Sequence, residues 1–105
     1  MAKYNPTTGA IDMEGMDPES PWGASLYIHE SVHKAQHKQH GWKYRFLYWQ
    51  NNWTFERPAY YAQICFLLQS EVRQSRFAWL RDILDMGYNS TKPSDVEDLL
   101  DELQI

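Results

Sequence analysis

The segment His29-Glu30-Ser31-Val32-His33 contains two histidines four residues apart, with a glutamate directly after the first. In a helix, residues four apart lie one turn apart on the same face, so both imidazoles can reach one zinc ion at about 2.0–2.1 Å. Glu30 is rotated by about 100° from His29, which directs its carboxylate beside the metal rather than onto it. In that position Glu30 can take a proton from a water molecule at the metal, as a general base does in hydrolysis.

A zinc site of this kind needs a third protein ligand, and a second helix must supply it. Glu56 lies 23 residues after His33, at the expected start of a later helix. The connection is long enough for the two helices to pack side by side. We therefore predict a Zn²⁺ site formed by His29, His33 and Glu56, with water in the fourth position.

Other interpretations of the histidines remain open. His33 and His37 are also four residues apart, and His40 lies on the same stripe. Three ligands on one straight helix approach an ion from one side and cannot surround it tetrahedrally. We interpret His37 and His40 as surface histidines near the helix end, where cationic side chains are favoured. The whole pattern is alternatively a solvated, histidine-rich helix face without metal.

The joint pattern resembles the small zincin-like metallopeptidases of the gluzincin type, which are common in bacterial and phage genomes. Their pattern is His-Glu-x-x-His, often followed by x-x-Gln, and then Glu-x-x-Ala at the start of the next helix. This chain has Gln36 at the glutamine position and Ala59 three residues after Glu56, with Tyr60 following. The resemblance covers residues 22–69, less than half of the chain.

The resemblance implies a metallopeptidase with a minimal zincin-like helical core. It implies that His29, His33 and Glu56 bind zinc and that Glu30 is the general base of peptide-bond hydrolysis. Such enzymes usually align the substrate along the edge strand of a sheet, and no convincing strand pair is evident in this sequence. Larger members also use a His or Tyr to stabilise the oxyanion. Three tyrosines are open candidates for that role: Tyr27, Tyr60 and Tyr61.

The histidine-containing helix has clear boundary signals. It is predicted to begin at Asp17 or Ser20, which can cap the first turn, followed by Pro18 or Pro21. Gly41 is predicted to end it as a left-handed cap. On a helical wheel, one stripe contains Trp22, Leu26 and the four histidines. The core positions expected beside this stripe are Ser25, Ile28, Val32 and Ala35.

The helix containing Glu56 is predicted to begin at Thr54, with Pro58 tolerated in its first turn. Before it, residues 42–49 alternate aromatic and polar side chains, which suits a strand, but their length also suits two helical turns. We favour a helix for this segment. The expected apolar face of the Glu56 helix consists of Phe55, Ala59, Ala62 and Phe66.

Two further helices are predicted towards the C-terminus. One spans about residues 72–86 and stops at Gly87, and the other opens with a capping box at residues 94–97. The residues expected to face inward are Phe77, Leu80 and Leu84 in the first, and Val96, Leu99, Leu100 and Leu103 in the second.

The chain of 105 residues predicts a single, mainly α domain with at most a small sheet. Residues 1–20 are expected to form an irregular N-terminal arm, since turn pairs interrupt any hydrophobic period. This arm could be flexible, wrap over the core or dock as a strand. Residues 21–90 form the expected helical domain, and residues 91–105 an acidic helix that packs on the domain or on a partner.

The composition limits the expected classes of binding partner and the expected cellular compartment. The formal charge of −4 argues against nucleic acid, and no apolar run approaches the roughly 18 residues of a membrane span. The start of the chain lacks a signal-peptide pattern, and the single Cys65 suits a reducing compartment. We therefore expect a cytoplasmic protein, or a virion-associated one if phage-encoded, without nucleic-acid or membrane partners.

Two functions follow from the predicted site. In the first, Glu30 activates water and the protein hydrolyses a peptide or protein substrate. In the second, the zinc site is catalytically silent and stabilises an interaction protein, such as a phage virion or assembly component. A homo-oligomer or an assembly with phage or host proteins is compatible with so small a core.

Overall fold

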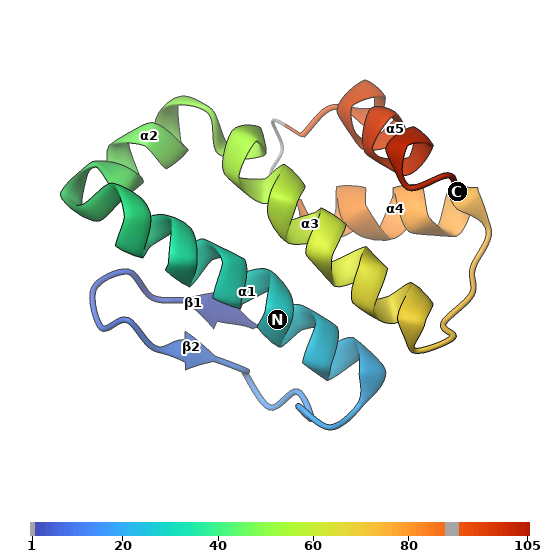
Figure 1. The fold of residues 1–105 in the computed structure, drawn as a ribbon, viewed down its shortest axis with the longest axis horizontal. Coiled ribbons are helices and arrows are strands. Elements are labelled where there is room, and N and C mark those ends of the chain that lie inside the picture. The colour runs from blue at the N-terminus through green and yellow to red at the C-terminus, as the bar shows by residue number, and fades with distance from the viewer. Residues whose placement is uncertain (1, 88–90) are drawn as a thin grey trace.

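A computed structural model describes residues 2–87 and 91–105 (Figure 1). Within these ranges the fold is mainly α with one very small sheet, as the sequence predicts. The elements in chain order are β1 (Lys3–Tyr4), β2 (Ile11–Asp12), α1 (Pro21–His40), the 3₁₀ helix η1 (Gly41–Lys43), α2 (Tyr44–Gln50), α3 (Asn52–Gln69), α4 (Arg76–Met86) and α5 (Pro93–Glu102). The domain boundary expected at residue 90 falls among residues 88–90, which lie outside the described ranges.

Helix α1 has the predicted boundaries. Ser20 is the N-cap, because its hydroxyl oxygen accepts a hydrogen bond from the Gly23 amide at 3.0 Å, and Pro21 takes the first helical position. Gly41 ends the helix with a φ of 61°, which favours glycine. Its ψ of −137° lies outside the left-handed helical region that we expected for this cap.

Helices α1 and α3 lie side by side in opposite directions, connected by η1 and α2 (Figure 1). The buried stripe of α1 contains His29 and His33 themselves. The expected core positions beside that stripe are partly wrong: Ala35 is exposed, and Ile28 and Val32 are only half-buried. The reason is that α3 packs directly over the histidines rather than beside them.

Segment 44–50 is helical, as favoured, and α3 starts two residues earlier than predicted. Asn51 caps α3 by accepting a hydrogen bond from the Thr54 amide, so the helix already begins at Asn52. Pro58 therefore lies inside the helix rather than in its first turn. Because proline has no amide hydrogen, it cannot donate a hydrogen bond to the carbonyl of Thr54. On the expected apolar face, Phe55 and Ala59 are buried, whereas Ala62 and Phe66 are half-buried.

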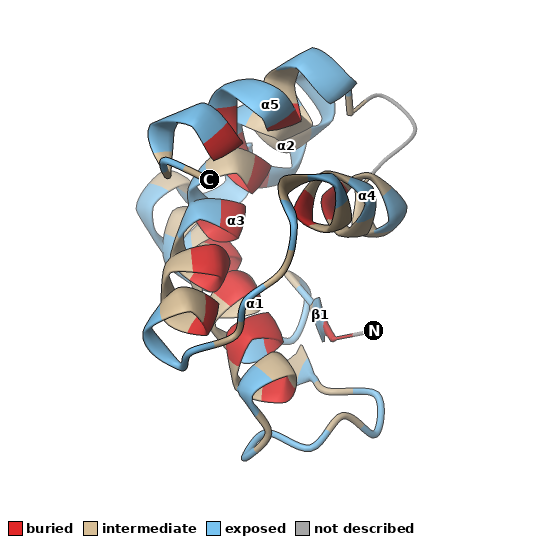
Figure 2. Cartoon of the chain, turned by 90° about the vertical axis from the view of Figure 1, so that its right-hand side faces the viewer, coloured by how far each residue is buried: buried red, intermediate tan, exposed pale blue. Residues whose placement is uncertain are grey.

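The apolar core lies where α4 and α5 pack on α3 (Figure 2). Eight residues form its buried cluster: Tyr60, Ile64 and Leu67 from α3, Trp79 and Ile83 from α4, and Val96, Leu99 and Leu100 from α5. The C-terminal helix therefore docks on its own chain through the leucines that the sequence singled out. None of the helices in the described ranges combines the length and apolar character of a membrane span.

The predicted start of α4 is wrong, and its predicted inward face is right for Leu80 and Leu84, which pack on the core, but wrong for Phe77. Ser75 caps this helix by accepting a hydrogen bond from the Ala78 amide at 3.1 Å, so residues 72–75 are not helical. Trp79 is buried in place of Phe77, which is 70% exposed. The cause is that α4 turns its tryptophan towards α3 and α5, a choice that the helical period alone does not determine.

The capping box predicted for the last helix is also wrong. Lys92 is the N-cap of α5 and forms no side-chain capping hydrogen bond. Pro93 occupies the first turn, so Ser94 is already inside the helix. Proline suits this position because the first-turn amides have no partner within the helix. Gly87 ends α4 as predicted.

Within the N-terminal arm, residues 3–4 and 11–12 form a short hairpin, and the other described residues up to Ser20 are turns and irregular chain. Strands β1 and β2 are antiparallel, with Lys3 opposite Asp12 and Tyr4 opposite Ile11. The hairpin packs on α1, where the Tyr4 hydroxyl forms a 2.6 Å hydrogen bond with His37 Nδ1. Of the arrangements left open by the sequence, the structure has the ordered wrap over the helices.

Because Leu100 is fully buried between α3, α4 and α5, we expect Leu100→Ala to lower the free energy of unfolding by about 2–5 kcal/mol, measured by urea denaturation. Phe77→Ala removes a larger but exposed side chain and should change it by less than about 0.5 kcal/mol. Equal effects of the two variants would contradict docking of α5 on this core.

Candidate metal centre

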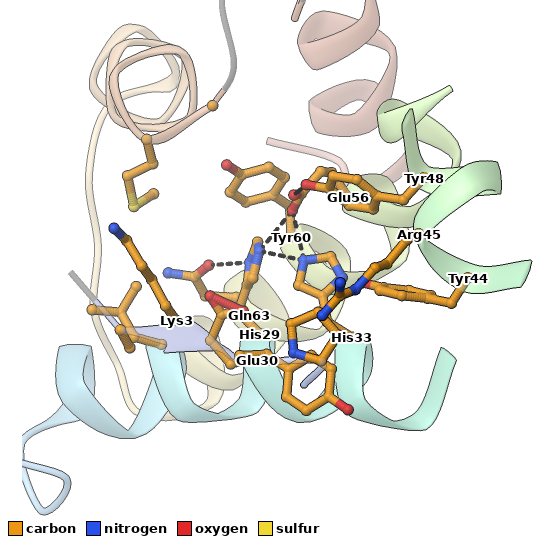
Figure 3. Close-up of a pocket in the computed structure, with 16 residues that line it drawn as sticks. Lys3, His29, Glu30, His33, Tyr44, Arg45, Tyr48, Glu56, Tyr60 and Gln63 are labelled. Atoms are coloured by element: carbon orange, nitrogen blue, oxygen red, sulfur yellow. Dashed lines mark hydrogen bonds and ion pairs between the residues drawn. The ribbon is translucent and has the colours of Figure 1, made fainter. Parts of the chain in front are cut away.

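The structure brings the three predicted zinc ligands together between α1 and α3 (Figure 3). Glu56 Oε1 lies 2.8 Å from His29 Nε2 and 2.8 Å from His33 Nε2. The two Nε2 atoms are 3.2 Å apart. All three side chains are buried, so little water competes for these atoms.

The orientation of the His29 ring is fixed by a chain of hydrogen bonds. The Ser25 hydroxyl donates to the Trp22 carbonyl at 2.7 Å, so its oxygen is an acceptor for the Gln63 amide nitrogen at 3.4 Å. The Gln63 carbonyl oxygen therefore faces His29 Nδ1 and accepts a hydrogen bond from it at 2.9 Å. This arrangement leaves His29 Nε2 directed at Glu56.

The His33 ring is oriented by Gln36 in the same way. The Gln36 amide nitrogen donates to the Phe55 carbonyl, which can only accept, at 2.9 Å. Its carbonyl oxygen therefore accepts a hydrogen bond from His33 Nδ1 at 2.9 Å. Metal-binding histidines commonly donate their second nitrogen to such a partner, which fixes the tautomer. Gln36 thus both orients a predicted ligand and links α1 to α3.

The two oriented rings and the carboxylate fit a cation. With Nδ1 protonated, a neutral imidazole presents a lone pair at Nε2, so three acceptor atoms converge on one point. Such atoms repel one another unless a proton or a metal ion lies among them. Ligand atoms of a tetrahedral zinc with bonds of about 2.0–2.1 Å are about 3.3 Å apart. The observed separations of 2.8–3.2 Å need only a small expansion to reach this geometry.

The pKa shifts at the cluster favour positive charge at the same point, whether it is a proton on Nε2 or a metal ion. Burial alone raises the pKa of the Glu56 carboxyl, but hydrogen bonds and positive charge from His29 and His33 outweigh it, so the pKa lies well below its usual range. Burial lowers the pKa of His33, but the hydrogen bond and the negative charge of Glu56 outweigh it and raise the pKa. The carboxylate therefore stays ionised and favours a positive charge between the rings.

Glu30 lies next to His29 and His33, and the three together form a group that could hold a metal ion. Glu30 lines the same pocket, and one ligand-capable atom each of His29, Glu30 and His33 lie within 4.8 Å of one another. Burial raises the pKa of Glu30, and a hydrogen bond from the backbone of Tyr4 partly opposes this shift. A half-buried carboxylate with a raised pKa, next to the cluster, is suited to accept a proton from water.

Three residues at the site were not predicted from the sequence. Gln63 orients His29, and the Tyr48 hydroxyl donates a hydrogen bond to Glu56 Oε2, which leaves Oε1 for the cluster. Tyr4 reaches Glu30 through its backbone. Gln63 follows Glu56 by seven residues, so the helical period could have placed it on the same face. No local signal predicts Tyr4 or Tyr48.

The structure distinguishes the tyrosines that the sequence offered for the oxyanion, and it places the two remaining histidines outside the cluster. Of the three tyrosines considered for the oxyanion, Tyr60 lines the pocket, with its ring 4.5 Å from that of His29. Tyr27 and Tyr61 are 48% and 38% exposed and do not line it. His37 contacts Tyr4, and His40 lies edge-on to Phe55, so neither belongs to the cluster.

The cluster opens into a pocket of about 510 Å³ between α1, α2, α3 and the hairpin. Its walls are largely apolar and aromatic, with Leu26, Tyr44 and Met86 among the lining residues, and Lys3 and Arg45 add positive charge. Strand β1 forms one side of the pocket through Ala2, Lys3 and Tyr4. A volume of this size lies within the usual range of ligand-binding pockets.

Comparisons with protein-family models, curated proteins and solved structures find no match to this chain. The interpretation of the site therefore rests on its own geometry and on the pattern of residues. The resemblance to gluzincin-type peptidases stays a hypothesis. What the geometry adds is the convergence of Glu56 with both histidines across two helices.

We expect the protein purified without added metal to contain about one zinc per chain, measured by elemental mass spectrometry, and to gain thermal stability with added zinc. Glu56→Ala should lose the metal because one of three protein ligands is removed. Glu30→Gln should retain it because the three predicted ligands, His29, His33 and Glu56, stay intact. Less than about 0.2 zinc per chain, with no stabilisation by zinc, would contradict the site.

Gln63→Leu should weaken zinc affinity by about 10–100-fold, measured by competition with a chromogenic chelator, because His29 loses the acceptor that orients its ring. Gln69→Leu is the matched control, since Gln69 is an exposed glutamine of the same helix. Its affinity should equal that of the wild type. Unchanged affinity in Gln63→Leu would show that the hydrogen bond does not position a ligand.

Proposed function

We propose that this protein is a zinc-dependent hydrolase of peptide bonds, with His29, His33 and Glu56 as metal ligands and Glu30 as general base. The observation that carries the proposal is the buried meeting of both Nε2 atoms with one carboxylate oxygen, with the carboxylate of Glu30 close to both histidines. A purely structural metal site has no need of that second carboxylate. Its presence favours catalysis.

The residues have separate tasks in this proposal. Zn²⁺ in the cluster supplies Lewis acidity towards water and the substrate carbonyl. Glu30 accepts the proton of the attacking water and passes it to the leaving amine. Its raised pKa suits this exchange, because a base must also release the proton that it accepts. The backbone of Tyr4 holds the carboxylate of Glu30 in place.

The pocket suits an extended peptide beside the cluster. Strand β1 borders the pocket next to Glu30, and the family that the sequence resembles aligns its substrates along such an edge strand. The aromatic walls from Tyr44 and Tyr60 favour an apolar side chain at the cleaved bond. Tyr60 is the best-placed of the three tyrosines considered for the oxyanion, since it alone among them lines the pocket.

A specific observation favours a second function, a zinc site that only stabilises the fold. The groups around the cluster connect α1 with α3 at three places, through Glu56, Gln63 and the contact of Gln36 with the Phe55 carbonyl. A metal there would fasten the two longest helices of this small protein. In that case the protein is an interaction or assembly component, such as part of a phage virion.

Cleavage of a mixed peptide library distinguishes the two functions. We expect the zinc-loaded wild type to cleave peptides, and zinc-loaded Glu30→Gln to be slower by about 10²–10⁴-fold, because it lacks the general base. Both proteins must first be shown to contain equal zinc. Mass spectrometry of the products then gives the cleaved bond and the preferred side chains.

The control for this experiment is Glu19→Gln, which changes an exposed glutamate outside the pocket and should leave cleavage unchanged. Equal cleavage by the wild type and Glu30→Gln would assign the activity to a contaminant or to another group. If neither protein cleaves peptides and zinc stabilises both, the result would favour the structural function.

A further inference from the structure

The outer face of η1 and α2 exposes three large aromatic side chains. Trp42 is 84% exposed, Phe46 57% and Trp49 79%. The spacing of four and then three residues places them in one row along the helix. We call Trp42, Lys43, Phe46 and Trp49 the α2 aromatic surface. Exposed apolar groups that form a row, rather than being scattered singly, are typical of a contact surface.

The opposite face of α2 already packs within the protein. Tyr44 is 5% exposed and contacts Phe55, and the Tyr48 hydroxyl is bonded to Glu56. The helix is therefore held in place by its inner tyrosines, and the outer aromatic residues add nothing to the described core. Figure 1 shows α2 at the outer edge of the molecule, where the start of α5 approaches it near Trp49.

Charge is segregated along the sequence in this region, and in space Lys92 and Asp95 of α5 share a pocket with Trp49. All 14 acidic residues lie outside residues 31–55, and that segment contains four of the ten lysines and arginines: Lys34, Lys38, Lys43 and Arg45. The protein as a whole is negative, with a formal charge of −4, so this positive segment is a local feature. A binding partner of complementary charge is anionic.

We propose that the α2 aromatic surface binds an anionic phospholipid membrane. Tryptophan and phenylalanine favour the boundary between headgroups and acyl chains, and neighbouring lysines bind the lipid phosphates. This binding needs no membrane-spanning segment. The sequence argued against a membrane partner only because it contains no such segment. The proposal does not depend on peptidase activity, since none of these four residues lines the pocket.

The geometry favours lipid over nucleic acid. Stacking of a base requires an open ring face, and the Lys43 ammonium, 5.6 Å from the centroid of the Trp42 ring, covers one of the two faces of that ring. Insertion into a headgroup layer requires only that the rings project in one row, while a long lysine side chain extends back to the phosphates. The α2 aromatic surface meets both conditions.

Co-sedimentation of the full-length protein with vesicles tests the proposal. We expect binding to vesicles of phosphatidylcholine mixed with phosphatidylserine, little binding to phosphatidylcholine alone, and weaker binding at high salt. The double variant Trp42→Ala/Trp49→Ala should bind at least about tenfold more weakly. Phe77→Ala, which removes a 70% exposed aromatic side chain from α4, is the matched control and should bind as the wild type does.

Lys43→Glu provides a second variant that keeps the aromatic row and should also weaken binding to the anionic vesicles. Circular dichroism and zinc content must match the wild type in each variant. The proposal is overturned if the wild type does not sediment with anionic vesicles, or if the double variant binds them equally well. It is also overturned if the double variant loses only binding to a single-stranded oligonucleotide, or only self-association.

Discussion

Two imidazole nitrogens and one carboxylate oxygen converge between α1 and α3, within 3.2 Å of one another and largely out of contact with water. Such a cluster is tolerated in a protein interior only if a positive charge lies among its members. That requirement explains the surrounding hydrogen bonds. Gln36 and Gln63 accept hydrogen bonds from the Nδ1 atoms of the two histidines, and the Tyr48 hydroxyl donates a hydrogen bond to the second oxygen of Glu56. The remaining lone pairs are therefore directed to one point.

The same constraint divides the buried residues of α3 into a polar and an apolar set. The polar set, Glu56 and Gln63, contacts the histidines of α1, and the apolar set supplies Tyr60, Ile64 and Leu67 to the core, with the Tyr60 ring also 4.5 Å from that of His29. No buried side-chain donor or acceptor among the described residues lacks a hydrogen-bond partner. Helices α4 and α5 complete the apolar core. The candidate site and the apolar core thus adjoin each other along α3.

Helix α2 shows a related division on a smaller scale. Its inner tyrosines contact Phe55 and Glu56, whereas its outer aromatic residues are exposed. The inner contacts tie the position of α2 to the geometry of the predicted metal ligands. The hairpin has a similar double role, because Tyr4 contacts His37 through its hydroxyl and Glu30 through its backbone. The connecting and terminal segments therefore help to position the site.

The sequence alone predicted the mainly helical fold, the boundaries of α1 and the buried leucines of α5, and it named the residues of the candidate site. These features depend on local rules: a serine cap followed by proline, and side chains three or four residues apart that share a helix face. The tertiary structure decided the rest. It set Trp79 rather than Phe77 in the core, paired Gln63 with His29 and Tyr48 with Glu56, and folded the arm into a hairpin beside Glu30. These choices depend on which surface packs against which, and helical spacing is the same whichever face a neighbouring element covers.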